Sequence, residues 1–243
     1  MSQSPPTPND DRSDASGFVL PDAGKLEALA EFAAGAGHEI NNPLATIIGR
    51  AQLLLKDERD PQRRQMLLAI GAQAYRIRDM IGDAMLFGRP PTPELRQVDL
   101  AIAVSEVLSK QADDLAADHC TVSVEIPNDL TLKADSAQLA IVLSELLRNS
   151  RQALQSVSGG EIRVRGHSRD EFAVIEIEDR GQGFSEIERR HAFDPFFSGR
   201  QAGRGLGFGL SKCWRVVRQH GGHIEVESSP AGPTVVRVTW PRF

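Results

Sequence analysis

The chain has 243 residues, enough for one sizeable domain or two modest ones, and its 40% hydrophobic and 25% charged residues are ordinary for a folded protein. A net charge of -5 argues against sequence-independent binding to nucleic acid, because such binding needs concentrated Lys and Arg. Cys120 and Cys213 fit no zinc or disulfide pattern. Neither an apolar leader nor a membrane span is visible, so we expect a cytoplasmic protein.

Residues 1–22 are rich in Ser, Pro, Asp and Asn, a composition that predicts a disordered tail. Beyond them, apolar or small residues recur at alternating steps of three and four, which is the spacing of a coiled-coil seam. The seam positions are 26, 29, 33, 36, 40, 44, 47, 51 and 54, and then 67, 70, 74, 77, 81 and 84. Asp60 and Pro61 separate the two runs, and Pro90 follows the second. We therefore predict a hairpin of two helices over residues 23–90.

Both helices of this hairpin carry an apolar seam, and one hairpin alone would leave much of that surface in contact with water. Pairing with a second copy into a four-helix bundle buries it. We therefore predict a homodimer. The alternative is a single hairpin that the following domain covers.

After the prolines the pattern changes, and residues 95–243 predict a second domain of mixed elements. Helices are expected at 99–118, 135–155 and 210–219, and strands at 121–126, 161–166, 172–178, 223–227 and 235–240. This order predicts an α/β sandwich, in which helices cover one face of a mixed sheet. The whole chain is thus expected to be an α+β multidomain protein.

His38 begins a polar segment in the first predicted helix, two residues past a seam position, and we expect it to face solvent. Glu39 can accept a hydrogen bond from one ring nitrogen of His38, which leaves the other nitrogen free to attack phosphorus. Pro43 lacks an N–H and is expected to kink the helix. Asn42 lies one turn after His38, where its amide could orient a water molecule. A polar helix surface is the alternative interpretation.

Three segments of the second domain point to a nucleotide. Asn149, inside a predicted helix, is either a Mg²⁺ ligand or an incidental surface amide. Asp179 follows a predicted strand and precedes Gly181 and Gly183, where it can accept a hydrogen bond from an adenine amino group or belong to a simple turn. Residues 203–209 form a Gly-rich run that leads into a helix and can cradle phosphate, unless it is a linker. Neither a Walker loop nor a Rossmann unit fits the sequence.

Taken in chain order, these segments resemble the sensor histidine kinase family over nearly the whole chain from about residue 24. The matching segments are residues 38–44 (H box), 145–149 (N box), 179–183 (first glycine box), 194–197 (F box) and 203–209 (second glycine box). The resemblance implies a dimerisation and histidine phosphotransfer domain, residues 23–90, joined to a Bergerat-type ATP-binding domain, residues 95–243.

The resemblance also implies a role for each matching residue. His38 would be the phosphoacceptor, Glu39 its acid–base partner, and Asn42 the position associated with dephosphorylating the partner. Asn149 and Glu145 would bind Mg²⁺, and Asp179 would anchor adenine. The implied nucleotide-binding residues are Asn149, Asp179, Gly181, Gly183, Phe197, Arg200, Gly203, Arg204, Gly205, Leu206 and Gly207.

Two departures from the family pattern concern the nucleotide site. Glu145 stands where many kinases have Asn and is similar to the acidic residue of chaperone ATPases, so water activation is conceivable. Ser198-Gly199-Arg200 replaces the common Thr-Thr-Lys, and the lid is short.

The activity implied by the resemblance is ATP-dependent autophosphorylation of a protein histidine (EC 2.7.13.3), followed by transfer to an Asp of a separate response regulator. Input would come through a separate sensor protein or through the N-terminal tail. The alternatives are a regulator phosphatase and a dimeric scaffold that binds nucleotide.

Overall fold

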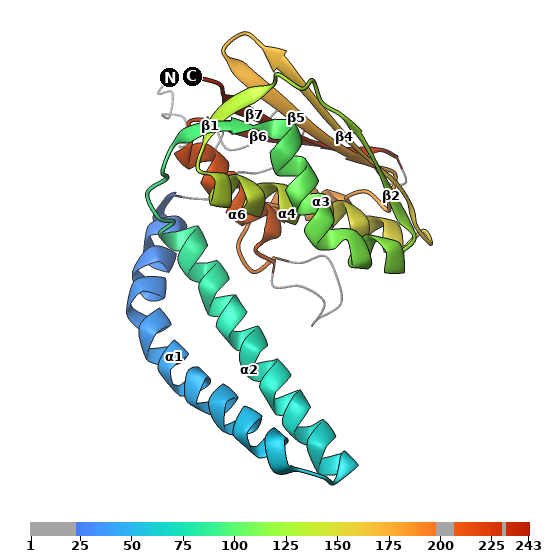
Figure 1. Ribbon diagram of the computed structural model, residues 1–243. Coiled ribbons are helices and arrows are strands. Elements are labelled where there is room, and N and C mark those ends of the chain that lie inside the picture. The colour runs from blue at the N-terminus through green and yellow to red at the C-terminus, as the bar shows by residue number, and fades with distance from the viewer. Residues whose placement is uncertain (1–22, 198–206, 230–231) are drawn as a thin grey trace, which may run out of the picture. The chain divides into compact units, whose positions relative to one another are not determined.

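The computed structural model describes residues 23–197, 207–229 and 232–243 (Figure 1). The chain divides into two compact units, of which one is Asp22–Pro91 and the other includes Thr92–Phe243. Among the described helices, none combines the length and the apolar character needed to cross a membrane.

The first unit is a hairpin of α1 (Ala23–Asp57) and α2 (Pro61–Gly88). The Asp60 side chain accepts a hydrogen bond from the backbone N–H of Arg63 at 2.8 Å and caps α2, and Pro61 occupies its first turn. Helix α1 continues through Pro43, and it is bowed whereas α2 is straight (Figure 1). A proline that removes one helical hydrogen bond accounts for such a bend.

The predicted apolar seam of the hairpin is confirmed in part. Leu44, Ala51 and Ala74 are buried as predicted, but Ile47 is exposed and Ile48 packs inward in its place. An α-helix has 3.6 residues per turn, so a seam counted at 3.5 residues per turn drifts around the helix surface.

The second unit contains a small and a large sheet. Strand β1 (Arg96–Asp99) pairs antiparallel with β3 (Thr131–Ala134). The large sheet has five strands in the order β2-β4-β5-β7-β6. Their bounds are β2 Cys120–Glu125, β4 Gly160–Arg169, β5 Phe172–Asp179, β7 Thr234–Pro241 and β6 His223–Ser228. Only β2 and β4 pair in parallel, so the sheet is mixed, as predicted.

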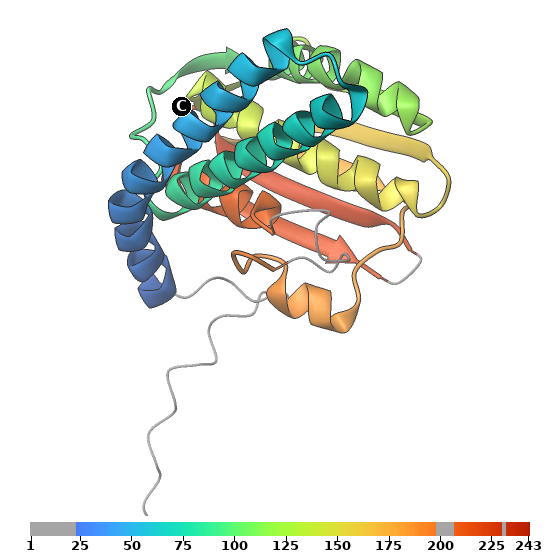
Figure 2. The ribbon, with the colours of Figure 1, turned by 90° about the horizontal axis from the view of Figure 1, so that it is seen from below.

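Three helices cover one face of the large sheet, namely α3 (Leu100–Ala117), α4 (Ser136–Gln155) and α6 (Gly209–Gln219) (Figures 1 and 2). Residues that alternate along the strands, such as Ile162 and Val164 on β4, are buried against these helices. The other face carries ion pairs, including Arg165–Glu178 at 2.7 Å. The α/β sandwich is therefore confirmed.

The structure also contains elements that the sequence pattern did not predict. Strands β1 and β3 have four residues each, too few for an alternating pattern to stand out. Helix α5 (Glu186–His191) has six residues and was missed, although its capping box of Ser185 and Glu188 is a recognisable start signal.

Candidate functional site

The predicted phosphoacceptor segment lies in the middle of α1. The backbone of His38 is helical, but its side chain lies outside the described part of the structure. The prediction that His38 faces solvent therefore also concerns a part that is not described. Glu39 and Asn42 are exposed on the same helix. Gly37, which sequence reasoning did not single out, is buried, and a Cβ there would lie 2.6 Å from Met85 Sδ. The absence of a side chain at Gly37 thus lets α1 approach α2 closely beside His38.

Helix α4 places Glu145 and Asn149 one turn apart. The Glu145 side chain is buried and forms two ion pairs, one between Oε1 and Lys212 Nζ at 2.7 Å and one between Oε2 and Arg148. Asn149 is half-buried. Lys212 comes from α6 and was missed in the sequence, where nothing connects a lysine in an amphipathic helix to a carboxylate 67 residues earlier.

Asp179 is buried at the end of β5, and its Oδ1 accepts a hydrogen bond from the Gly181 N–H at 3.0 Å. The Ser150 hydroxyl of α4 also donates to this carboxyl group. Burial raises the pKa of Asp179 above its usual value, and the two hydrogen bonds oppose that rise. Gly181 lies against α4 so closely that a Cβ would be 2.6 Å from the backbone carbonyl carbon of Ala153. Gly183 follows in the same turn.

The predicted F box is described as far as Phe197. The Phe197 ring lies 5.2 Å from the ring of His191, and His191 Nδ1 lies 2.8 Å from Asp194 Oδ2. Gly207 has a φ of 69°, and a Cβ there would lie 2.4 Å from the Phe197 carbonyl oxygen, so only glycine fits. The other predicted lid residues lie outside the described residues; they are Arg200, Gly203, Arg204, Gly205 and Leu206.

The start of α6 meets α4 at the predicted Mg²⁺ ligand. A Cβ on Gly209 would lie 3.2 Å from Glu145 Oε2 and 3.3 Å from both amide atoms of Asn149. Ser150, the residue of α4 that follows Asn149, donates its hydroxyl hydrogen bond to the Asp179 carboxyl group. The structure thus brings together the predicted adenine anchor, the predicted Mg²⁺ ligand and the end of the Gly-rich run, all around α4.

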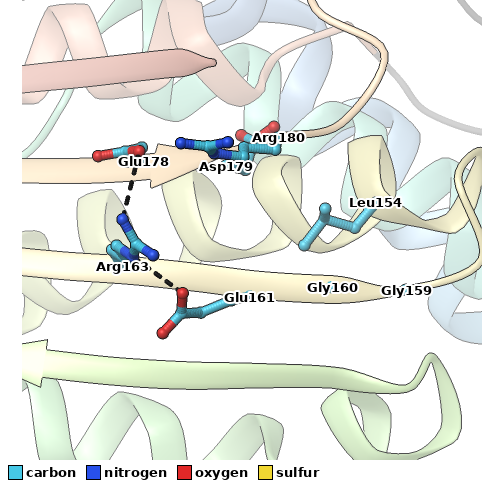
Figure 3. A pocket seen from close by; sticks show the side chains of 8 residues that line it. All are labelled: Leu154, Gly159, Gly160, Glu161, Arg163, Glu178, Asp179 and Arg180. Atoms are coloured by element: carbon cyan, nitrogen blue, oxygen red, sulfur yellow. Dashed lines mark hydrogen bonds and ion pairs between the residues drawn. The ribbon is translucent and has the colours of Figure 1, made fainter. Parts of the chain in front are cut away.

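A pocket of about 200 Å³ opens beside Asp179, at the end of β5 and the start of β4 (Figure 3). Its polar lining includes Arg180 and the ion pairs that Arg163 forms with Glu161 and Glu178. Asp179 is the one predicted nucleotide-binding residue in this lining. The pocket therefore lies where β5 ends beside β4, whereas Asn149 and Gly209 meet where α6 begins beside α4.

Family models match both units of the chain. Residues 28–93 match the model described as "His Kinase A (phospho-acceptor) domain". Residues 134–243 match the model described as "Histidine kinase-, DNA gyrase B-, and HSP90-like ATPase".

The chain is also similar to individual histidine kinases, both in sequence and in structure. The signal transduction histidine-protein kinase AtoS of Escherichia coli is 33% identical over 210 residues, which cover 86% of this chain and 34% of AtoS. Full-length ShkA in complex with AMPPNP has a TM-score of 0.76 at 20% identity, covering 87% of this chain and 45% of that one. The histidine kinase ThkA in complex with the response regulator TrrA has a TM-score of 0.63 at 22% identity, covering 90% and 64%. The chain spans about a third of the length of the first curated relatives that it matches.

Proposed function

Because this chain belongs to the sensor histidine kinases of two-component systems, we propose that it transfers the γ-phosphoryl group of ATP to its own His38. The observation that carries the proposal is the cluster around α4, where Asp179, Asn149 and Gly209 converge from separate segments. That cluster supplies what a nucleotide site needs, namely a buried acceptor, an amide ligand and a glycine-led helix start.

ATP supplies the phosphoryl group, and this chain's residues would bind and orient it. Asp179 fits the adenine amino group, because its buried carboxylate accepts hydrogen bonds and already holds a fixed orientation. The phosphates fit the start of α6, where the N-cap residue Phe208 makes no side-chain cap and the first backbone N–H groups need an acceptor. In this proposal Arg200 and Arg204 add positive charge and Phe197 borders the lid.

Mg²⁺ would neutralise charge on the phosphates. Among the described residues no three His, Cys, Asp or Glu side chains gather as a metal site. The amide oxygen of Asn149 would hold the ion together with the nucleotide's own phosphates and water, because Mg²⁺ in nucleotide sites takes few ligands from the protein. Glu145 lies beside Asn149, but both of its oxygens already pair with cations.

The transfer itself needs a neutral, oriented imidazole. Glu39 is exposed one residue after His38 and can accept the proton of one ring nitrogen, so that the other nitrogen attacks phosphorus. We propose that the phosphoryl group then passes to an Asp of a response regulator. The solved complex of ThkA with TrrA, which has the same fold, supports this class of partner. Because ATP is the proposed donor, the chain would act in the cytoplasm.

The experiment is incubation of the purified chain with γ-labelled ATP and Mg²⁺, beside a His38→Gln variant. We expect acid-labile, base-stable label on the wild type alone, since phosphohistidine has that stability. An Arg50→Gln variant, altered at an exposed position of the same helix, controls for nonspecific damage to α1. Label on His38→Gln, or none on a wild type that still binds ATP, would overturn the proposal.

A second candidate activity is removal of phosphate from the regulator, and the exposure of Asn42 on α1 favours it. An amide one turn from His38 could orient a water molecule towards a phosphoaspartate. We expect Asn42→Ala to slow dephosphorylation of a phosphorylated regulator while autophosphorylation continues. Equal dephosphorylation rates in both proteins would eliminate this activity.

A further inference from the structure

Lys212 is a buried lysine whose place in the fold has no packing explanation. Its side chain is 6% exposed, in a helix whose neighbouring positions Leu210, Cys213 and Val216 belong to the apolar core. Burying a charge is costly, and a buried ion pair is often no more stable than well-packed apolar residues of similar size. An aliphatic residue at this position would serve the core better. The presence of a lysine here therefore calls for an explanation other than apolar packing.

The partner of Lys212 points to that explanation. Lys212 Nζ lies 2.7 Å from Glu145 Oε1, and the Glu145 side chain is itself only 8% exposed. Arg148 pairs with the second oxygen, Oε2. The carboxylate is thus held from both sides by cations, one on α6 and one on its own helix.

This ion pair lies directly beside the proposed phosphate and Mg²⁺ site. Glu145 is one turn before Asn149, and Gly209, at the start of α6, borders both residues. A carboxylate free to turn at this place could bind Mg²⁺ or accept a proton from water. In the second case the water oxygen would bond to the γ-phosphorus, the bond to the β–γ bridging oxygen would break, ADP and phosphate would leave, and the water proton would go to Glu145.

We propose that Lys212 is a positioning residue that holds Glu145 against α6, so that the carboxylate neither binds Mg²⁺ nor activates water, and the phosphoryl group is reserved for His38. The inference rests on the proposed ATP-dependent function and adds to it a barrier against hydrolysis. Without this restraint, the Glu145 carboxylate would act as a base beside ATP and divert the phosphoryl group to water.

The test measures phosphate release and phosphohistidine in the same reaction of the full chain with ATP and Mg²⁺. General-base assistance is worth about 10²- to 10⁴-fold, so even partial release of Glu145 in Lys212→Met should raise phosphate released per phosphohistidine by at least about tenfold. Lys212→Arg keeps a cation and should restore most of the wild-type ratio. Lys212→Met with Glu145→Gln should also return to that ratio, because the base is gone. Arg218→Met, which removes an exposed cation from the same helix, is the matched control.

A binding measurement gives a readout that does not depend on turnover. A fluorescent, non-hydrolysable ATP analogue is titrated with Mg²⁺, and a released Glu145 should lower the Mg²⁺ concentration for half-saturation in Lys212→Met by about fivefold or more, as an added carboxylate ligand would. The double variant should reverse this shift. Lys212→Gln, whose neutral side chain is shorter than that of lysine and holds Glu145 less firmly, replaces Lys212→Met if circular dichroism shows that the latter is unfolded.

The outcomes separate this inference from the kinase proposal. A folded Lys212→Met or Lys212→Gln variant that only loses nucleotide binding, with no gain in phosphate release and no Mg²⁺ shift, means that Lys212 is merely structural and overturns the inference. A wild type that binds the analogue but makes no phosphohistidine overturns the kinase proposal, and the Mg²⁺ titration still tests Lys212.

Discussion

At the scale of single residues, Asp179 has a buried carboxyl group to which the Gly181 N–H and the Ser150 hydroxyl both donate. Burial is the largest influence on this group and raises its pKa. A carboxyl group whose folded-state pKa is raised stabilises the fold below its unfolded-state pKa, and that contribution is lost as the pH rises through the folded-state pKa. At neutral pH the ionised Asp179 therefore lowers the free energy of unfolding, a cost that is consistent with its proposed role in binding adenine.

We accordingly predict opposite effects of Asp179→Asn on stability and on binding. The neutral amide can still accept from Gly181, so the melting temperature of the nucleotide-free protein should rise at pH 7, and the gain should vanish in acid. Affinity for a fluorescent ATP analogue should fall by at least about tenfold, because a hydrogen bond to a charged group is worth about 1.5–3 kcal/mol. Calorimetry and an analogue titration measure the two effects. Asp129→Asn, at an exposed position, should change neither. A lower melting temperature with unchanged affinity would contradict this account.

At the scale of secondary-structure elements, His220 joins the end of α6 to the start of α4. The Asp135 backbone N–H donates to Nε2 at 3.1 Å, and Nδ1 lies 2.9 Å from the Val216 carbonyl oxygen, to which its N–H donates. Both bonds need the neutral ring, and burial lowers the pKa of His220 below 6.5. Protonation would place a hydrogen on Nε2 and break the bond from Asp135. The nearby Asp135 carboxylate, whose own pKa is lowered mainly by the Gln138 N–H, opposes the effect of burial.

The sign of the pH dependence follows from the lowered pKa. The folded state binds fewer protons than the unfolded state, so the stabilisation is complete above about pH 6.5 and is lost as the pH falls through the folded-state pKa. We predict that wild type loses more unfolding free energy than His220→Gln when the pH falls from 7.5 to the acid side of this window. Urea unfolding at several pH values measures the difference. His167→Gln, at an exposed position, should keep the wild-type pH dependence. A parallel loss in wild type and His220→Gln would refute the assignment.

The same elements show how far a sequence can predict this fold. The start of α4 was predictable because the Asp135 cap is a local signal, and its Oδ1 does accept from the backbone N–H groups of Ala137 and Gln138. The ion pair between Lys212 and Glu145 was not, because it depends on how α6 lies across α4. Likewise, the order of the predicted motifs is a property of the sequence, whereas the contact of Gly209 with Asn149 is a property of packing.

At the scale of the whole molecule, the helical hairpin displays large apolar side chains that one copy does not bury. Leu54 is 60% exposed, Ile70 is 50% exposed, and Ile47 and Ile77 are also exposed. Each large apolar side chain contributes about 1.5–3 kcal/mol when it is fully buried. A second copy of the hairpin would cover such a surface symmetrically, and we therefore propose that the chain forms a homodimer.

We predict that Leu54→Glu combined with Ile70→Glu converts the full chain from dimer to monomer. Because a C2 interface uses each position twice, two substitutions per chain place four charges in the buried surface. Sedimentation equilibrium should then give a mass near 26.5 kDa for the variant and about double that value for wild type. Ile187→Glu, which is 68% exposed on α5 in the other unit, should remain dimeric. A variant that stays dimeric would move the interface away from this surface. A wild type that is monomeric at every concentration would favour a single hairpin whose apolar side is covered within one chain.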